Sequence, residues 1–409
     1  MTITNDRNTG LPPLSKAALI VALLLITTGA SLRLFAPPQF RPRGYDEALY
    51  RNYVTMLNDH TLAVYPKLVR MYIAEQKATG ETKLPPTRFL YIGLAHAWSL
   101  LLNVKPILAL QTISCIFSIL MMPLAGWFAY RLGGERIALG VLALVTFSPM
   151  QIYVARHALI DGFFGFWAIM CVWLLWENLQ KPAHRSWLAA YTAALALMVL
   201  TKENAFFVFV AIVGILAINQ RTKFGTVSRP LVICTFVGGL LGTAGIALLA
   251  GGLDYAFETY LLLVRNASHL EYAIRTGDGP WYRYISDLLL MSPIVLLLAI
   301  GAIFHLNREK KTQLYLLSFV GFSYLVMCNV KYGMNLRYAN MWDMPLRFLA
   351  FSQLAAMCVR FGKREAFILT LCVVGLCTYD LHQYGIFFAK NELYELIPFD
   401  LARSLNMIK

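Results

Sequence analysis

An acidic pair, Asp46 and Glu47, stands just beyond the first long apolar run of this 409-residue chain. Other ionisable residues recur at the ends of later apolar runs, and they include Arg88, Arg156, Asp161, Lys202, Glu203, Lys331 and Arg337. Arginine and lysine are suited to binding phosphate, whereas carboxylates are suited to deprotonating a hydroxyl or holding a divalent metal. An enzyme that takes a sugar from a lipid phosphate needs both kinds of group, because one binds the leaving phosphate and the other activates the acceptor.

The composition indicates where these groups lie. The chain is 58% hydrophobic and only 14% charged, with a mean hydropathy of +0.58. Soluble domains carry about 25% charged residues. Since many apolar runs are long enough to cross a hydrocarbon layer, we predict an all-α polytopic membrane protein. The formal net charge of +14 is then loop charge on a membrane protein, and no nucleic-acid partner is expected.

Windows of about 19 mostly apolar residues predict about eleven transmembrane helices. They cover 16–35, 106–130, 137–155, 159–178, 187–201, 203–219, 230–252, 285–305, 313–328, 344–359 and 366–388. A further apolar stretch, 89–102, is shorter and follows Arg88, so we interpret it as an interfacial or re-entrant helix.

Loop charge predicts the topology. With the N-terminus inside, every short inner loop carries two or three cations, which is the positive-inside pattern. These cations are Arg131 and Arg136; Lys181 and Arg185; Arg221, Lys223 and Arg229; Arg308, Lys310 and Lys311; and Arg360, Lys363 and Arg364. Residues 1–388 then form a single transmembrane domain. Its outer loops are 36–105, which contains juxtamembrane helices, and 253–284, and residues 389–409 are a short outer C-terminal tail.

One outer turn is too tight to hold its charges in bulk water. Lys202 and Glu203 lie between two apolar spans, and the first of these is only about fifteen residues long, below the usual minimum of about 17. Such a span stops below the outer surface and leaves its charges in a recess. Ionisable groups at that depth are costly and commonly mark a substrate path.

The ordered motifs resemble the GT-C glycosyltransferases, in particular the protein O-mannosyltransferases and the bacterial lipid A aminoarabinose transferases. The run 44–50 is similar to their first outer acidic motif, and Lys83, which Leu84 separates from two prolines, is similar to their Lys-Pro-Pro stretch. The remaining matches are Arg156 with Asp161, Thr201-Lys202-Glu203, Gly279-Pro280-Trp281-Tyr282-Arg283-Tyr284, and Arg337-Tyr338 with Pro345.

The resemblance implies a transferase that moves a sugar, with inversion, from a polyprenyl-phosphate donor to a glycan, lipid or peptide acceptor. Asp46 would be the general base, with Glu47 and Asp161 as further catalytic carboxylates. The donor phosphate would meet Arg156, Lys202, Arg337, Lys331, Arg88 and Lys83, and the sugar or lipid would meet Tyr45, Glu203, Trp281 and Tyr282. The resemblance implies no definite cofactor, and a divalent metal on Asp46, Glu47 and Asp161 is left open.

The expected location is a bacterial or archaeal cytoplasmic membrane, with membrane lipids as partners and the active site on the outer face. Two other functions fit part of the pattern. One is a transporter or flippase for a charged lipid or solute, and the other is an outer-leaflet glycan ligase or polymerase. Charges at outer helix ends, without internal repeats, favour the transferase over a transporter.

Overall fold

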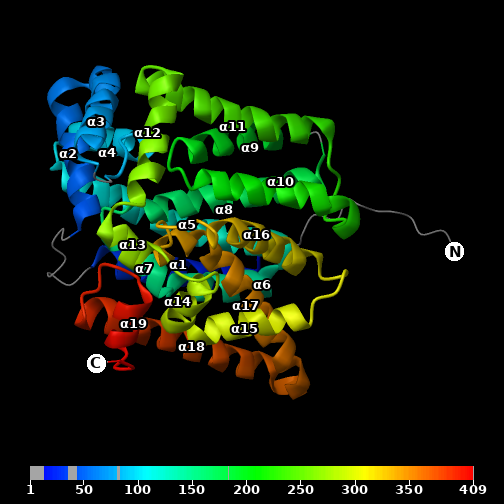
Figure 1. Cartoon of the computed structure of the whole chain (residues 1–409). Coiled ribbons are helices and arrows are strands. Elements are labelled where there is room, and N and C mark those ends of the chain that lie inside the picture. Colours follow the sequence, from blue (N-terminus) through cyan, green and yellow to red (C-terminus); the bar gives the residue numbers. More distant parts are fainter. Residues whose placement is uncertain (1–12, 36–43, 81–82, 183, 409) are drawn as a thin grey trace.

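The computed structural model describes residues 13–35, 44–80, 83–182 and 184–408, and every regular element among them is helical (Figure 1). This confirms the predicted all-α class. The first half of the chain forms α1 (Lys16–Leu34), α2 (Tyr45–His60), η1 (Leu62–Val64), α3 (Tyr65–Thr79), α4 (Phe89–Leu102), α5 (Pro106–Gly133), α6 (Glu135–Thr146), α7 (Pro149–Arg156), α8 (Ile160–Gln180) and α9 (Arg185–Val199). Residues 36–43, which open the predicted loop 36–105, lie outside the described part.

The second half forms α10 (Ala205–Thr222), α11 (Arg229–Ala250), α12 (Leu253–Ala267), α13 (Glu271–Gly277), α14 (Arg283–Met291), α15 (Pro293–Phe304), α16 (Lys311–Met327), η2 (Leu336–Trp342), α17 (Asp343–Cys358), η3 (Val359–Arg364), α18 (Glu365–Tyr384), η4 (Gly385–Lys390) and α19 (Pro398–Ser404). Each of the eleven predicted spans coincides with a helix or a bent helix pair. By length and apolarity, six helical segments of the described residues are able to cross a membrane, or seven if α6 and α7 count as one span. The number eleven therefore stays a prediction.

Two predicted continuous spans are broken. The span 137–155 divides into α6 and α7, which meet at 52°. Ser148 caps α7 by accepting a hydrogen bond from the backbone N–H of Gln151 at 3.4 Å, and Pro149 occupies its first turn. The span 285–305 divides at Ser292 because Pro293 begins α15. Proline lacks the N–H that a continuous helix needs, so both breaks follow from the residue types.

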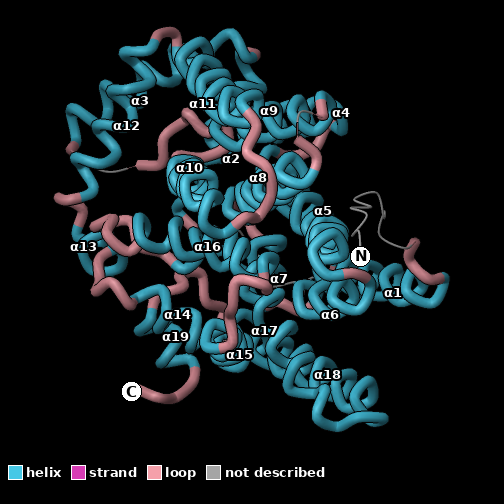
Figure 2. Tube along the Cα trace, turned by 90° about the vertical axis from the view of Figure 1, so that its right-hand side faces the viewer, coloured by secondary structure: helices cyan, strands magenta, loops and turns pink. Residues whose placement is uncertain are grey.

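The segments that the sequence predicts to lie outside gather at one end of the long helices. Figure 1 shows α2, α3, α12, α13 and α19 together at that end, with the C-terminus beside them. Figure 2 looks along the long helices and shows α1 and α18 at the edge and α8 near the middle. Nearly the whole of α8 is buried, as expected for a helix that is apolar on all sides.

The first outer segment packs as a small helical subassembly. Apolar residues of α2 recur at Tyr50, Tyr53, Val54 and Leu57, a helical spacing that places them on one face. That face joins α3 and α4 in a single apolar cluster. With only 14 residues, α4 is shorter than a full crossing, as the interfacial or re-entrant interpretation requires. The packing fixes the first turn of α2, where the acidic pair lies.

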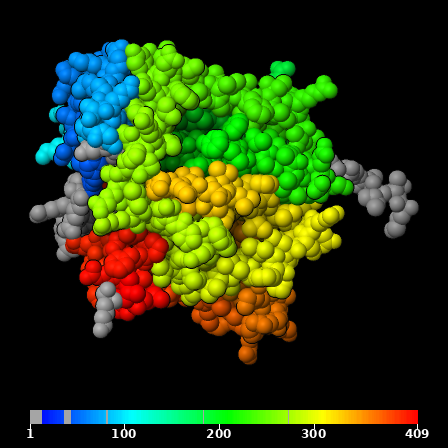
Figure 3. Space-filling model, viewed as in Figure 1, coloured from blue at the N-terminus to red at the C-terminus, as the bar shows by residue number. Residues whose placement is uncertain are grey.

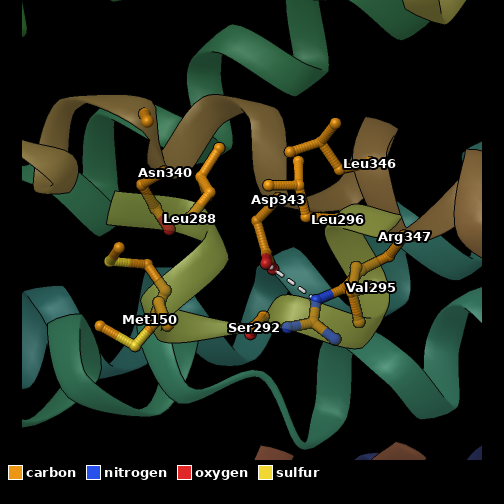
Figure 4. A pocket seen from close by; sticks show the side chains of 11 residues that line it. Met150, Leu288, Ser292, Val295, Leu296, Asn340, Asp343, Leu346 and Arg347 are labelled. Carbon is orange, nitrogen blue, oxygen red and sulfur yellow. Dashed lines mark hydrogen bonds and ion pairs between the residues drawn. The ribbon is translucent and has the colours of Figure 1, made fainter. Parts of the chain in front are cut away.

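A buried charge network holds the C-terminal half together. The Arg347 guanidinium donates to Asp343 Oδ1 at 2.8 Å and to Asp380 Oδ2 at 2.6 Å, which ties α17 to α18. Ser292, at the break between α14 and α15, donates to the other oxygen of Asp380 at 3.2 Å. Figure 4 shows the small pocket beside this break, with the Asp343–Arg347 contact drawn. Charges at this depth are tolerated because they are paired.

Replacing Arg347 by Met should destabilise the protein by about 3–5 kcal/mol, because two carboxylates would lose their cation in a buried site. Thermal unfolding in detergent would measure the change. Arg275→Gln is the matched control, since its ion pair with Glu271 is exposed and should contribute little. Wild-type stability in Arg347→Met would show that the network does not hold the fold.

Candidate active site

The first turn of α2 presents Asp46 to the site. The helix begins after Gly44, whose backbone N–H donates to Glu47 Oε2 at 3.3 Å. Asp46 is half-buried, with 23% of its side chain exposed, and its Oδ2 lies 3.1 Å from Nη2 of Arg337. Carboxylates are favourable in the first turn of a helix because they oppose the positive end of its dipole.

The cation that faces this carboxylate, Arg337, is buried, with 5% of its side chain exposed. Asn335 Oδ1 accepts hydrogen bonds from the Arg337 backbone N–H at 3.0 Å and from its Nε at 3.3 Å. Glu395 lies 3.6 Å from Nη2. Among the described residues, Nη1 of Arg337 is buried and has no hydrogen-bond partner. A guanidinium held on two sides with one free buried nitrogen is a ready anion site.

A second ion pair joins Asp161, at the start of α8, to the tight turn between α9 and α10. Lys202 Nζ lies 2.6 Å from Asp161 Oδ1 and 3.8 Å from the centre of the Tyr338 ring. Asn340 donates to the Asp161 backbone carbonyl at 3.2 Å. The helix α9 has 15 residues, as the sequence predicts, and Lys202 is almost fully buried.

A third pair completes the group. Arg88 Nε donates to Glu203 Oε2 at 3.2 Å, and its two terminal nitrogens contact Glu203 Oε1 and the Tyr50 hydroxyl. Tyr50 follows Asp46 by one helical turn, so both project from one face of α2. We call Asp46, Arg88, Asp161, Lys202, Glu203 and Arg337 the charged cluster. Its members form one electrostatic unit, because the charges of Lys202, Arg337 and Arg88 all act on Asp161.

Glu47 faces away from the charged cluster. Its side chain is fully buried, and Oε1 accepts the backbone N–H of Ala158 at 2.7 Å and lies 3.5 Å from His157 Nδ1. Burial alone would raise the pKa of Glu47. Its contacts with His157 and with the backbone N–H groups of Ala158 and Gly44 outweigh burial, so the pKa lies below its usual value. Glu47 thus ties the start of α2 to the turn between α7 and α8.

Other predicted site residues lie apart from the cluster. Arg156 contacts the Tyr384 hydroxyl and the backbone carbonyls of Leu32 at 2.5 Å and Phe35 at 3.2 Å, so it binds the end of α1. Lys83 pairs with Glu75, and Lys331 is exposed. Tyr45, Trp281 and Tyr282 are exposed aromatic residues. The predicted roles of these residues stay predictions.

The three carboxylates that the sequence offers for a metal, Asp46, Glu47 and Asp161, do not come together as a metal site. Among the described residues, no group of three or more His, Cys, Asp or Glu side chains has a metal-binding arrangement. Asp46 and Asp161 each face a cation, and both oxygens of Glu47 accept backbone N–H groups. These contacts do not fit a shared divalent ion, so no step is assigned to one.

Sequence reasoning missed several residues that contact the cluster. Tyr50 and Tyr338 belong to the quoted motifs, and their spacing from Asp46 and Arg337 is the signal that could have found them. Tyr394 and Glu395 lie in the predicted C-terminal tail, where nothing in the local sequence marks them.

The helical membrane fold and this collection of acids and cations agree with the membrane glycosyltransferase that the sequence predicts. A family model described as dolichyl-phosphate-mannose-protein mannosyltransferase matches residues 43–250, and the chain belongs to that family. It is therefore an enzyme and an integral membrane protein, which sets the transporter alternative aside. The match contains Asp46, Arg88, Asp161, Lys202 and Glu203 and ends before Arg337.

Solved structures show the same fold at low identity. ArnT from Cupriavidus metallidurans bound to undecaprenyl phosphate is 13% identical, with 96% of this chain and 74% of that chain covered and a TM-score of 0.54. Archaeal AglB from Archaeoglobus fulgidus, an oligosaccharyltransferase in complex with an inhibitory peptide and a dolichol-phosphate, is 10% identical, with 95% and 56% covered and a TM-score of 0.58. The chain thus spans about half the length of the archaeal enzyme. No curated protein sequence matches.

Glu47→Ala should lower stability by about 1–3 kcal/mol, because the Ala158 N–H would be left buried without its charged acceptor. The lowered pKa means that this contribution is present near neutral pH and is lost as the pH falls through and below the usual glutamate range. The difference from wild type should therefore shrink in acid, as measured by unfolding in detergent. Asp59→Ala, which truncates an exposed carboxylate of the same helix, is the control and should unfold like wild type; an equal loss there would contradict a role for the buried Glu47 contact.

Proposed function

We propose that this protein transfers a sugar from a polyprenyl-phosphate donor to an acceptor hydroxyl at the outer membrane face, with inversion and with Asp46 as general base. The observation that carries the proposal is the pair formed by partly exposed Asp46 and buried Arg337, whose Nη1 has no hydrogen-bond partner among the described residues. One group is placed to take a proton, and the other is placed to take a phosphate oxygen.

The family of this chain and the solved structures that share its fold support a polyprenyl-phosphate donor. Its family is named for a dolichyl-phosphate-mannose donor. The two solved structures of the same fold hold undecaprenyl phosphate and a dolichol-phosphate. The buried cations Arg88, Lys202 and Arg337 match the chemistry of such a phosphate, because a desolvated cation interacts strongly with an anion.

The reaction would proceed as a single displacement. The acceptor oxygen forms a bond to the anomeric carbon while its proton passes to Asp46. The bond between that carbon and the phosphate oxygen breaks, and its electron pair stays on the phosphate. Attack from the face opposite the leaving group inverts the configuration, as in carboxylate-assisted glycosidases. Cations fixed beforehand in a water-poor site stabilise the charge that develops on the phosphate.

Some of the other predicted site residues would contact the donor directly, and others would act only by positioning a helix. Lys202 and Arg88 lie in the charged cluster and are the nearest candidates after Arg337 for the phosphate. Arg156 would act through the position of α1, because its guanidinium is taken up by the end of that helix. The exposed rings of Trp281 and Tyr282 are suited to the sugar or the first prenyl units.

Asp46→Asn should lower turnover by at least about a hundredfold, since general base catalysis contributes 10²–10⁴-fold and an amide cannot take the proton. Transfer of labelled mannose from polyprenyl-phosphate-mannose to membrane-extract acceptors would measure turnover. Binding of undecaprenyl phosphate by native mass spectrometry should persist, because the Arg337 site is retained.

Asp59→Asn is the matched control, because it makes the same change at an exposed position near the other end of α2. It should transfer like wild type. Near-normal turnover in Asp46→Asn would remove Asp46 as the base. Loss of both turnover and lipid binding would place Asp46 in donor binding instead.

A further inference from the structure

The C-terminal segment between η4 and α19 packs against the charged cluster. Leu396 is fully buried, and the Tyr153 hydroxyl of α7 donates to the Tyr394 backbone carbonyl at 2.5 Å. The Tyr394 ring covers Gly44 so closely that a Cβ there would lie 1.7 Å from a ring atom, so a side chain at that position would require the ring to move. Figure 3 shows the C-terminal segment at the same end of the molecule as the first outer segment.

Two residues of this segment enclose Arg337. The Tyr394 ring centre lies 5.6 Å from the guanidinium carbon, and Glu395 Oε2 lies 3.6 Å from Nη2. That same nitrogen lies 3.1 Å from Asp46 Oδ2. Two carboxylates from opposite ends of the chain therefore share one nitrogen of one cation.

The two carboxylates are not held equally. Asn335 Nδ2 donates to Glu395 Oε2 at 3.1 Å, and the same Asn335 side chain accepts from Arg337, so Glu395 is fixed at a second point. For Asp46, Arg337 is the one hydrogen-bonding or ionic partner found among the described residues. When a further anion binds to Arg337, Asp46 is the carboxylate that is free to leave.

We propose that Glu395 is a positioning residue for sugar transfer, which holds Arg337 when the donor phosphate binds so that Asp46 is released from its ion pair to act as base. This inference rests on the proposed function. The donor phosphate would take Nη1 of Arg337, Glu395 would keep Nη2, and Asp46 would turn to the acceptor hydroxyl. The base would thereby become available only after the donor has bound.

Glu395→Gln tests this role, because the amide oxygen still accepts from Asn335 while the negative charge is lost. Asp46 would then be the sole carboxylate on Arg337 and would stay paired. We expect kcat to fall at least tenfold, whereas undecaprenyl phosphate binding should be unchanged or tighter, because one negative charge has been removed. Glu392→Gln, an exposed change in the same segment, is the control and should behave like wild type.

A double-mutant cycle separates this role from a general packing effect. Adding Glu395→Gln to Asp46→Asn should cause no further loss of turnover, because Glu395 acts through Asp46. If Glu395→Gln fails to fold, Glu395→Asp carries the same test, with lowered kcat and retained lipid binding. Normal turnover, or a parallel loss of turnover and lipid binding, would overturn the proposal.

The outcome for the base is distinguishable from the outcome for Glu395. An active Asp46→Asn variant would defeat the proposed function whatever Glu395→Gln does. An inactive Asp46→Asn together with a fully active Glu395→Gln would leave the function in place and defeat this inference alone.

Discussion

The arrangement of the charged cluster depends on the free-energy cost of burying the charged guanidinium of Arg337. A buried guanidinium loses its hydration, and this loss is offset only when nearby anions or hydrogen-bond acceptors contact it. Arg337 gathers Asp46 from α2 and Glu395 from the C-terminal segment, with Asn335 beside it. This requirement brings together parts of the chain that are 291 residues apart. The pairing therefore brings the site together, and among the described residues Nη1 of Arg337 is left without a hydrogen-bond partner.

Buried cations elsewhere show what a purely structural arrangement looks like. Arg33 of α1 donates to Ser118 and to the carbonyls of Gly29, Thr146 and Val145, so its guanidinium is fully engaged by uncharged acceptors that cannot easily move. Arg337 differs because its partners include two carboxylates and its Nη1 has no hydrogen-bond partner among the described residues. Incomplete bonding at a buried charge is costly and is retained where a ligand completes it.

The sequence could predict whatever depends on local apolarity and charge. Each predicted span has a helix, the fifteen-residue length before Lys202 is correct, and three predicted ion-binding residues, Arg88, Lys202 and Arg337, lie in one cluster. The helix breaks before Pro149 and Pro293 could have been predicted, because proline lacks a backbone N–H and favours the first turn of a helix. Windows of about 19 residues measure mean apolarity and do not detect such breaks. Glu395 could not be predicted, because the role that we propose for it depends on its contacts with Asn335 and Arg337, and no local pattern encodes a contact such as that with Asn335, 60 residues away.

The adjacent acids Asp46 and Glu47 divide between two duties because successive helical residues point about 100° apart. Both carboxylate oxygens of Glu47 accept backbone N–H groups, whereas Asp46 faces Arg337 and is the residue that we propose as the base. The balance of positive and negative side chains around Arg337 also bears on the proposed sugar transfer. Among the described residues, Arg88, Lys202 and Arg337 face four carboxylates, Asp46, Asp161, Glu203 and Glu395, so this set carries one negative charge in excess. A donor phosphate adds more. In the mechanism that we propose, displacing Asp46 from Arg337 and neutralising it with the acceptor proton would offset the charge that the leaving phosphate gains.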